Sequence, residues 1–212
     1  NVVGVIPGTL PPDQDQPILL GNHRDAWVYG AADPNSGTAA LLEVAQGLGR
    51  LVKEERWKPR RSIYLLSWSG EEYGLLGSTG WAELNEDRIK RAVAYLNVDT
   101  AVSGDRLTVE LTPSLSTVWE QVLDDLKVAG HSLPIGNGPH GQVVDANTNS
   151  VLQKTAGGRR MNRREHHPDE NMLGSGSDYT AFLDHFGVAS MDFEFRKRTV
   201  STYGEYHSIY DS

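Results

Sequence analysis

The chain has 212 residues, of which 38 % are hydrophobic and 23 % are charged, a balance typical of a single soluble, globular domain. Its formal net charge of −8 argues against nucleic acid as a partner, because binding to backbone phosphates requires a basic face. The sequence contains no cysteine, which excludes disulfide bonds and thiolate metal ligands. Any metal must therefore be bound by His, Asp or Glu.

Two strands are expected at the start of the chain, over residues 2–6 and 17–21, joined by a proline-rich, acidic turn. The second strand leads directly to His23 and, two residues later, to Asp25. His23 can bind a metal through one ring nitrogen while Asp25 accepts a hydrogen bond from the other and fixes the tautomer. Taken alone, the pair also fits a surface histidine supported by an aspartate.

A turn-rich loop over residues 29–37 is expected to lead into a helix over residues 38–52, capped by Asn35 or Ser36. Asp33 lies just ahead of this helix and is followed by a proline. An Asp–Pro bond can be cis at modest cost, which would change the direction of the carboxylate. The alternative is an aspartate that only stabilises the turn.

The stretch that organises the chain is an apolar, β-rich run over residues 62–66, followed by a turn with Glu71 and Glu72 and by a helix over residues 77–88. The carboxyl end of a strand is where open α/β sheets bind ligands. Because adjacent residues point in different directions, one glutamate can bind a metal while the other carries a proton. By itself, the pair also fits a solvated acidic turn.

A further apolar run over residues 92–100 contains Asp99 near its end, and buried strands of this kind are typical of a parallel or mixed sheet. A strand over residues 105–111 and a helix over residues 113–129 are expected next. Residues 130–173 are rich in Gly, Asn, His and Arg, a composition that predicts a long functional or mobile loop.

A segment rich in glycine and serine precedes a helix expected over residues 179–185, with Ser177 or Asp178 as its cap. Backbone amides at this helix entry, those of Ser175, Gly176 and Ser177, could hold an anion or a peptide carboxylate. A flexible helix entry without a ligand is the alternative.

A strand over residues 187–193 completes an alternation of strands and helices. The alternation predicts an α/β fold, a three-layer α/β/α sandwich around a mixed, mostly parallel sheet. In such a fold the polar residues at the strand ends converge on one edge. Two divalent metals need roughly five or six ligands, one of them a bridging carboxylate. The candidates for ligands and proton carrier are His23, Asp33, Glu71, Glu72, Asp99 and, near the chain end, His207.

Together these motifs resemble the peptidase domain of the M28 zinc peptidases, in the branch of glutamate carboxypeptidase II and the transferrin receptor. The similarity runs from about Asn1 to Asp211 in the same order and is broken mainly in residues 130–173. The residues that carry it are His23, Arg24, Asp25, Asp33, Pro34, Ser36, Gly37, Ser67, Trp68, Glu71, Glu72, Gly74, Leu75, Leu76, Gly77, Ser78, Asn97, Asp99, Tyr206, His207 and Ser208.

The resemblance implies two zinc ions with Asp33 as the bridging ligand. It places His23 and Asp99 on one zinc and Glu72 and His207 on the other. The implied activity is that of a zinc-dependent exopeptidase that cleaves small peptides, of the carboxypeptidase, aminopeptidase or dipeptidase type. Zinc bound by these groups lowers the pKa of water and polarises the peptide carbonyl.

Glu71 is implied as the general base, which takes the proton of the attacking water and delivers it to the leaving amine. Tyr206 matches a substrate-lining tyrosine of the family. Glutamate carboxypeptidase II has an anion-binding patch of one asparagine and two arginines, and the matching positions here are taken to be Ser177, Met191 and Phe193. A neutral or apolar side chain is therefore expected at this subsite.

Relatives in this family also have a protease-associated domain and a helical dimerisation domain, and neither is expected within these 212 residues. The chain is interpreted as a peptidase domain cut from a longer protein that forms a homodimer through a missing domain. No apolar run here approaches the roughly 18 residues of a membrane span. The resemblance implies a parent protein with an amino-terminal membrane anchor and an extracellular, vacuolar or secretory-lumen peptidase domain.

The alternative function is a non-catalytic receptor or sorting scaffold of the transferrin receptor type. Transferrin receptor has lost the zinc site, whereas every ligand position is filled in this sequence, which favours the enzyme.

Overall fold

The structure is a computed structural model. It describes residues 1–128, 143–144, 151–152, 173–196 and 204–212. The loop expected over residues 130–173 therefore lies almost entirely outside the described residues. Within that segment, β6 (Val143–Val144) pairs with β7 (Val151–Leu152).

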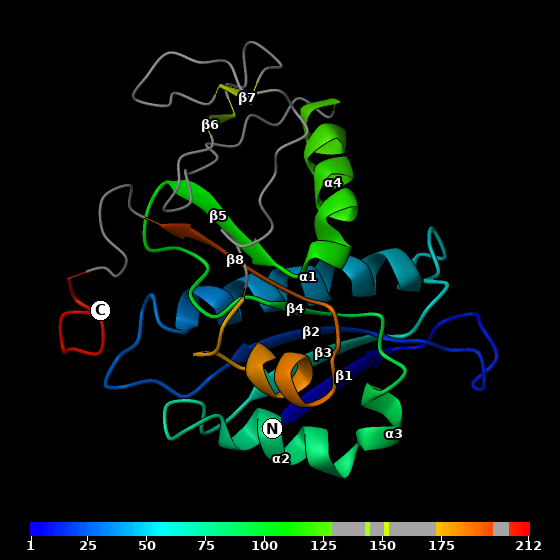
Figure 1. Cartoon of the computed structure of the whole chain (residues 1–212), viewed down its shortest axis with the longest axis horizontal. Coiled ribbons are helices and arrows are strands. Elements are labelled where there is room, and N and C mark those ends of the chain that lie inside the picture. Colours follow the sequence, from blue (N-terminus) through cyan, green and yellow to red (C-terminus); the bar gives the residue numbers. More distant parts are fainter. Residues whose placement is uncertain (129–142, 145–150, 153–172, 197–203) are drawn as a thin grey trace.

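Six strands form one mixed sheet at the centre of the molecule, in the order β1-β3-β2-β4-β8-β5 (Figure 1). The four inner strands are parallel, while β1 and β5 pair antiparallel at the two edges. This confirms the expected mixed, mostly parallel sheet. The strands are β1 (Val2–Ile6), β2 (Ile18–His23), β3 (Ile63–Trp68), β4 (Ala94–Asn97), β5 (Arg106–Leu111) and β8 (Ser190–Arg196).

Helices cover both faces of the sheet, so the α/β/α layering is confirmed (Figure 1). On one face lie α1 (Asn35–Lys53) and α4 (Ser116–Val128), the latter preceded by the short helix η1 (Pro113–Leu115). On the other lie α2 (Leu76–Leu84), α3 (Glu86–Ile89) and the π-helical segment η3 (Ala181–His185). Among the described residues, no helix combines the length and apolar character needed to cross a membrane.

The larger core cluster lies between the sheet and the layer formed by α2, α3 and η3. In it the Trp68 indole N–H donates to the Tyr95 hydroxyl at 2.9 Å, and the Tyr95 ring stacks on Phe182 with centroids 4.2 Å apart. Gly21 of β2 faces this pair, and a Cβ atom there would lie 1.8 Å from the Tyr95 hydroxyl oxygen. The close contact explains why the strand that leads to His23 has a glycine at this position.

The start of α1 differs from the expectation. The helix begins at Asn35, and Pro34 occupies the cap position without a side-chain hydrogen bond. Ser36 does not act as the cap, because its hydroxyl donates to the Ala32 carbonyl at 2.6 Å. The helix expected over residues 77–88 is also divided, into α2 and α3.

Candidate metal centre

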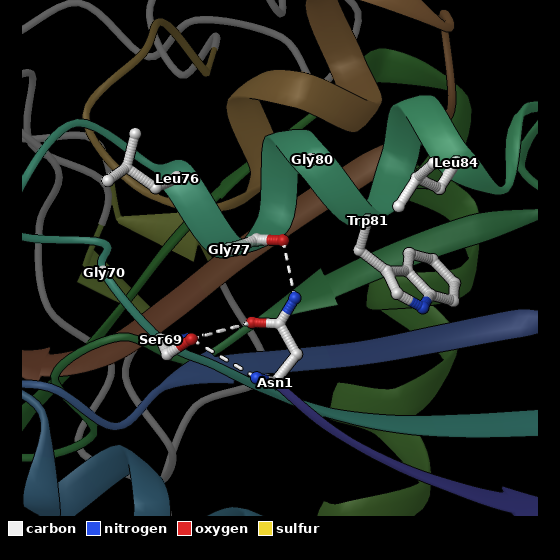
Figure 2. Close-up of a pocket in the computed structure, with 8 residues that line it drawn as sticks. All are labelled: Asn1, Ser69, Gly70, Leu76, Gly77, Gly80, Trp81 and Leu84. Atoms are coloured by element: carbon white, nitrogen blue, oxygen red, sulfur yellow. Dashed lines mark hydrogen bonds between the residues drawn. The ribbon is translucent and has the colours of Figure 1, made fainter.

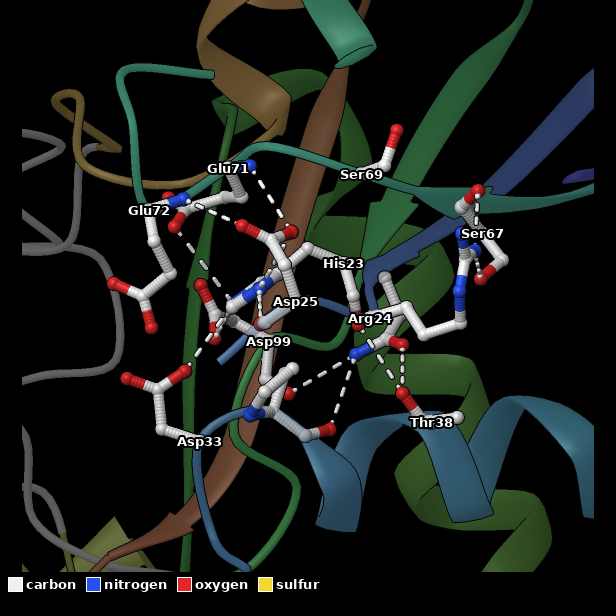
Figure 3. A network of polar contacts seen from close by, with 12 residues as sticks. His23, Arg24, Asp25, Asp33, Thr38, Ser67, Ser69, Glu71, Glu72 and Asp99 are labelled. Atoms are coloured by element: carbon white, nitrogen blue, oxygen red, sulfur yellow. Dashed lines mark hydrogen bonds and ion pairs between the residues drawn. The ribbon is translucent and has the colours of Figure 1, made fainter. Parts of the chain in front are cut away.

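The carboxyl ends of the parallel strands bring the candidate residues to one edge of the sheet (Figure 3). His23 is the last residue of β2, Glu71 and Glu72 lie in the turn after β3, and Asp99 follows β4. The sequence leads to this arrangement because buried apolar runs form the parallel strands, and polar residues follow each run where the strands end.

Asp33 reaches the same edge from the loop between β2 and α1, and its two carboxylate oxygens face two different histidines. Oδ1 lies 3.2 Å from His23 Nε2, and Oδ2 lies 3.1 Å from His207 Nε2. The residue is 5 % exposed, and Oδ1 accepts no well-aligned hydrogen bond. The Asp33–Pro34 bond is cis. Asp33 therefore stands between two groups of possible ligands, with a buried acceptor that has no proton donor.

His23 is buried, with both ring nitrogens in polar contacts. Nδ1 lies 2.9 Å from the backbone carbonyl of Asp25, which can only accept, so Nδ1 carries a proton. Nε2 lies 2.8 Å from Asp99 Oδ1. Burial lowers the pKa of His23, but the nearby carboxylates of Asp33 and Asp99 outweigh burial and raise the pKa to about 12. These carboxylates surround the ring with negative charge, which favours a bound proton and would also favour a metal cation in its place.

Asp25 acts on the site differently from the sequence expectation. Its carboxylate is 3.8 Å from His23 Nδ1 and instead accepts hydrogen bonds from the backbone N–H groups of Glu71 at 3.1 Å and Glu72 at 3.2 Å. The tautomer of His23 is set by the backbone carbonyl of Asp25. The Asp25 carboxylate shapes the turn that presents the two glutamates.

Glu71 and Glu72 point into different parts of the cluster, as expected for adjacent residues. Glu71 Oε2 lies 3.9 Å from His23 Nε2, whereas Glu72 Oε2 lies 3.0 Å from His207 Nε2. Burial raises the pKa of Glu71 to about 8; His23 opposes this shift and the charge of Asp99 adds to it. Burial and the charge of Asp33 also raise the pKa of Glu72.

His207 lies in a turn near the chain end and is held by a residue that the sequence reasoning did not single out, Asp211. The Asp211 carboxylate accepts hydrogen bonds from the backbone N–H groups of Ala32 at 2.7 Å and Asp33 at 3.2 Å. This ties the turn to the Asp33 loop. The sequence signal that could have identified Asp211 is its position as the last residue of the region that resembles the family.

Asn22 and Thr38 fix the backbone that supports the candidate ligands. The Asn22 amide donates to the carbonyls of Val98 at 2.9 Å and Asp99 at 3.2 Å, and the Thr38 hydroxyl donates to Asn22 Oδ1 at 2.7 Å. At Gly37, a Cβ atom would lie 2.0 Å from the Asp99 carbonyl oxygen. The start of α1 and the ends of β2 and β4 are thereby locked together.

Of the four residues expected to bind substrate, one lies beside His207, two are exposed and one is buried against Asp99. Tyr206 stacks on His207 with centroids 3.7 Å apart and therefore lies at the site. Ser175 and Gly176 are exposed. Ser177 is 4 % exposed and its hydroxyl donates to Asp99 Oδ2 at 2.6 Å. The expectation that the Ser177 side chain caps the following helix is wrong, because the hydroxyl is directed to Asp99.

Met191 and Phe193 do not face the site. Met191 is 6 % exposed and lies in a core cluster with η1, and Phe193 packs against the same cluster. The expected apolar subsite at these positions is therefore wrong. Because side chains alternate along a strand, the neighbouring Asp192 points to the opposite face of the sheet. There Asp192 accepts a hydrogen bond from Asn97 at 3.0 Å.

Exposed aromatic side chains that the sequence reasoning did not single out flank the His207 side of the cluster. The Trp27 ring lies 5.3 Å from that of Tyr73 and 6.5 Å from that of His207. Trp27 is 41 % exposed and Tyr73 is 68 % exposed. These rings offer apolar area beside the candidate metal ligands.

A separate hollow of about 430 Å³ lies between α2 and the amino end of the chain (Figure 2). Asn1 spans it, because its amide donates to the Gly77 carbonyl at 2.8 Å and its Oδ1 accepts from the Ser69 N–H at 3.1 Å. The remaining lining is glycine and apolar side chains, among them Leu76 and Trp81. Since the lining includes no carboxylate or imidazole side chain, we do not assign the candidate chemistry to this hollow.

The cluster fits a metal centre by its donor set. Three groups of side chains each bring their donor atoms within 4.8 Å of one another. Two of these groups share Asp33, whose unpartnered Oδ1 a metal would satisfy. Imidazole nitrogens and carboxylate oxygens are ligands that zinc accepts. The groups are His23, Asp33 and Asp99; Asp33, Glu72 and His207; and His23, Glu71 and Glu72.

Comparison with known proteins gives a family for the chain. A probable glutamate carboxypeptidase, LAMP1 of Arabidopsis thaliana, is 42 % identical over 100 % of this chain and 27 % of its own length. Aminopeptidase NAALADL1 of Mus musculus is 37 % identical, again over 100 % of this chain and 27 % of its own length. The chain thus spans about a quarter of the length of these curated relatives.

Solved structures share the fold at lower identity. An aminopeptidase from Aneurinibacillus sp. strain AM-1 matches with a TM-score of 0.62 at 20 % identity, over 99 % of this chain and 41 % of that chain. A glutaminyl cyclase from an Acidobacteriales bacterium matches with a TM-score of 0.57 at 20 % identity, over 99 % of this chain and 64 % of that chain. The family model described as Peptidase family M28 matches residues 1–212, and the chain belongs to this family.

Proposed function

We propose that this chain is the catalytic domain of a co-catalytic dizinc exopeptidase that hydrolyses small peptides. The observation that carries the proposal is the position of Asp33, with one carboxylate oxygen near His23 and the other near His207. A carboxylate between two ligand groups is what a bridged pair of metal ions requires. The names of the M28 relatives, carboxypeptidase and aminopeptidase, support the same reaction class.

In this proposal His23 and Asp99 hold one zinc, Glu72 and His207 hold the other, and Asp33 bridges the two ions. The contacts that support the grouping are His23 Nε2 to Asp99 Oδ1 at 2.8 Å and His207 Nε2 to Glu72 Oε2 at 3.0 Å. When bound, zinc lowers the pKa of the attacking water and polarises the substrate carbonyl.

Glu71 is the proposed general base. Its carboxylate lies in the cluster without belonging to either group that contains Asp33. Burial raises the pKa of Glu71 to about 8, close to the range in which a carboxylate can both accept and return a proton. Glu71 would take the proton of water as the peptide carbonyl is attacked, and then deliver it to the leaving amine.

The substrate enters, in this proposal, from the side of Trp27, Tyr73 and Tyr206, whose exposed rings flank His207. These rings can bind the side chains of a small peptide. Membrane anchoring and dimerisation of the longer parent protein stay predictions from the family resemblance.

Metal content of the purified chain tests the proposal. We expect about two zinc ions per chain by mass spectrometry after zinc is added and excess is removed. Asp33→Ala should lose both, since it removes the shared ligand, while Asp13→Ala, at an exposed aspartate in the connection between β1 and β2, should keep both. Failure of the wild-type chain to bind zinc, or two zinc ions in Asp33→Ala, would contradict the dinuclear site.

A further inference from the structure

A chain of buried and partly buried hydrogen bonds continues behind Asp99. Ser177 donates its hydroxyl proton to Asp99 Oδ2 at 2.6 Å. The Asn97 amide donates to the Ser177 hydroxyl oxygen at 3.0 Å and to Asp192 Oδ1 at 3.0 Å. Asn97 is fully buried and Ser177 is 4 % exposed. The links come from β4, from the segment before η3, and from β8, so three separate parts of the chain meet at this carboxylate.

The chemistry of each group gives the hydrogen bonds one direction. An amide nitrogen has two protons, and both protons of Asn97 are used, one on Ser177 and one on Asp192. Ser177 therefore accepts at its oxygen, and its single proton is left for Asp99. A hydroxyl that donates to a carboxylate makes a short, charge-assisted bond, in agreement with the 2.6 Å separation.

The result is an Asp99 carboxylate with two distinct oxygens. Oδ2 is occupied by the Ser177 hydroxyl, whereas Oδ1 lies 2.8 Å from His23 Nε2. Turning the carboxylate out of this orientation, about its bond to the side chain, would break the bond to Ser177. One oxygen is thus held toward His23 and Asp33.

We propose that Ser177, anchored by Asn97 and Asp192, is a positioning residue that holds Asp99 so that a single oxygen faces the metal beside His23. The inference rests on the proposed dizinc function. It gives Ser177 a different role from the substrate contact expected from the sequence. Partners that orient metal-ligating side chains typically affect metal affinity by 10–100-fold when mutated.

The experiment measures zinc affinity directly, without any assay of hydrolysis. The whole chain is stripped of metal and titrated with zinc against a competing chromophoric chelator. In Ser177→Ala, we expect the affinity of one of the two zinc ions to fall by 10–100-fold and the other to stay unchanged. Ser175→Ala is the matched control, because Ser175 lies in the same segment and is exposed, and its zinc affinities should equal those of the wild type.

A second pair of variants separates the hydroxyl from packing. Thr and Val have nearly the same shape, so Ser177→Thr and Ser177→Val disturb the buried site equally but only Thr can donate to Asp99. We expect Ser177→Thr to bind the zinc ion beside His23 more tightly than Ser177→Val does, by roughly the factor lost in Ser177→Ala, and the two variants to bind the other zinc ion equally. The comparison remains informative if Ser177→Ala fails to fold.

The outcomes distinguish this inference from the proposed function. Wild-type binding of two zinc ions with unchanged affinities in Ser177→Ala, or equal affinities in the Thr and Val variants, overturns the positioning role alone. No zinc binding by the wild-type chain overturns the proposed function and the inference with it. Weakening of one zinc site with rescue by Thr supports both.

Discussion

The two halves of the cluster differ in how they are built. The His23 half follows the central strands, and the His23 side chain is 1 % exposed. The His207 half depends on a turn near the chain end, where the His207 side chain is 35 % exposed and its backbone has a left-handed φ of 56°. The first half is fixed by the sheet, and the second is fixed by a surface turn that Asp211 ties to the Asp33 loop.

Supporting contacts hold the candidate ligands of the His23 half, whereas the His207 half is the more exposed of the two. Asp99 has a buried partner in Ser177, and the ring of His23 is oriented by a backbone carbonyl. Sites whose ligands are held by such supporting contacts are the more precise ones. His207, by contrast, lies beside the exposed rings of Trp27 and Tyr206. In the proposed function, a substrate would therefore contact the His207 half without disturbing the His23 half.

Substitutions of the two adjacent glutamates should have the strongest effects, on peptide turnover and on zinc content. Glu71 faces the His23 half and Glu72 faces the His207 half. Glu71→Gln should lower peptide turnover by roughly 10²–10⁴-fold while both zinc ions stay bound, because it removes the proton acceptor only. Glu72→Gln should instead lose zinc from the His207 half. Both variants are checked by peptide hydrolysis and by metal content. If Glu71→Gln loses zinc, Glu71 is a metal ligand and not only a base. If Glu71→Gln keeps full peptidase activity, Glu71 is not the general base.

The next effect is on the stability of the metal-free protein. His23→Ala leaves Asp99 without an imidazole partner and leaves the buried Asp33 carboxylate with His207 alone, which should cost about 3–5 kcal/mol in the free energy of unfolding. His207→Ala removes an imidazole that is 35 % exposed, and water entering in its place can solvate the carboxylates of Asp33 and Glu72, so the cost should be about 1 kcal/mol or less. Urea unfolding of both variants at pH 6, with chelator present, measures the difference. Equal losses would show that the halves do not differ in this way.

Behind the buried half, Asp178 should make the stability of the metal-free protein depend on pH. Its carboxyl group is fully buried, and burial raises its pKa to about 7. The folded state therefore binds a proton that the unfolded state has released above about pH 4, so stability is lost as the pH rises toward 7. Asp178→Asn removes this dependence.

We expect Asp178→Asn to gain about 1 kcal/mol over the wild type for each pH unit between about pH 4 and pH 7. Urea unfolding at pH 5 and pH 7 checks the slope, with Asp13→Asn as the control at an exposed aspartate. Parallel pH profiles for Asp178→Asn and the wild type would contradict the assignment.

The smallest expected effect concerns the turn that holds His207. Asp211→Ala removes the acceptor for the N–H groups of Ala32 and Asp33. We expect the affinity for the zinc in the His207 half to fall by roughly 10-fold, because a supporting contact of the ligand loop is lost. The other zinc should keep its affinity. Chelator competition measures both, and equal weakening of the two ions would show that Asp211 supports the whole cluster.

The sequence allowed the fold and most of the cluster to be predicted. Apolar runs that end in polar residues placed His23, the two glutamates and Asp99 at the carboxyl ends of strands, and a parallel sheet brings such ends together. These residues are now found within a few ångströms of one another. The prediction succeeded because burial and strand direction are encoded locally.

The directions of individual side chains could not be predicted in the same way. The strand expected over residues 187–193 is found as Ser190–Arg196, and Met191 and Phe193 face the core. Side chains alternate along a strand, so an error of one residue moves a position to the opposite face. The expected hydrogen bond between the Asp25 carboxylate and His23 is also not formed. The backbone carbonyl of Asp25 accepts from the same ring nitrogen instead.

The types of the candidate ligands and their order along the chain follow from the sequence alone. Which of their atoms meet depends on the tertiary fold, because these contacts join residues far apart in the chain. His23 and Asp99 are separated by 76 positions, and Asp33 and His207 by 174. Pairings at such separations depend on how the whole sheet and its turns pack, so the link from Asp99 to Ser177 and the tie from Asp211 to the Asp33 loop emerge only in the folded chain.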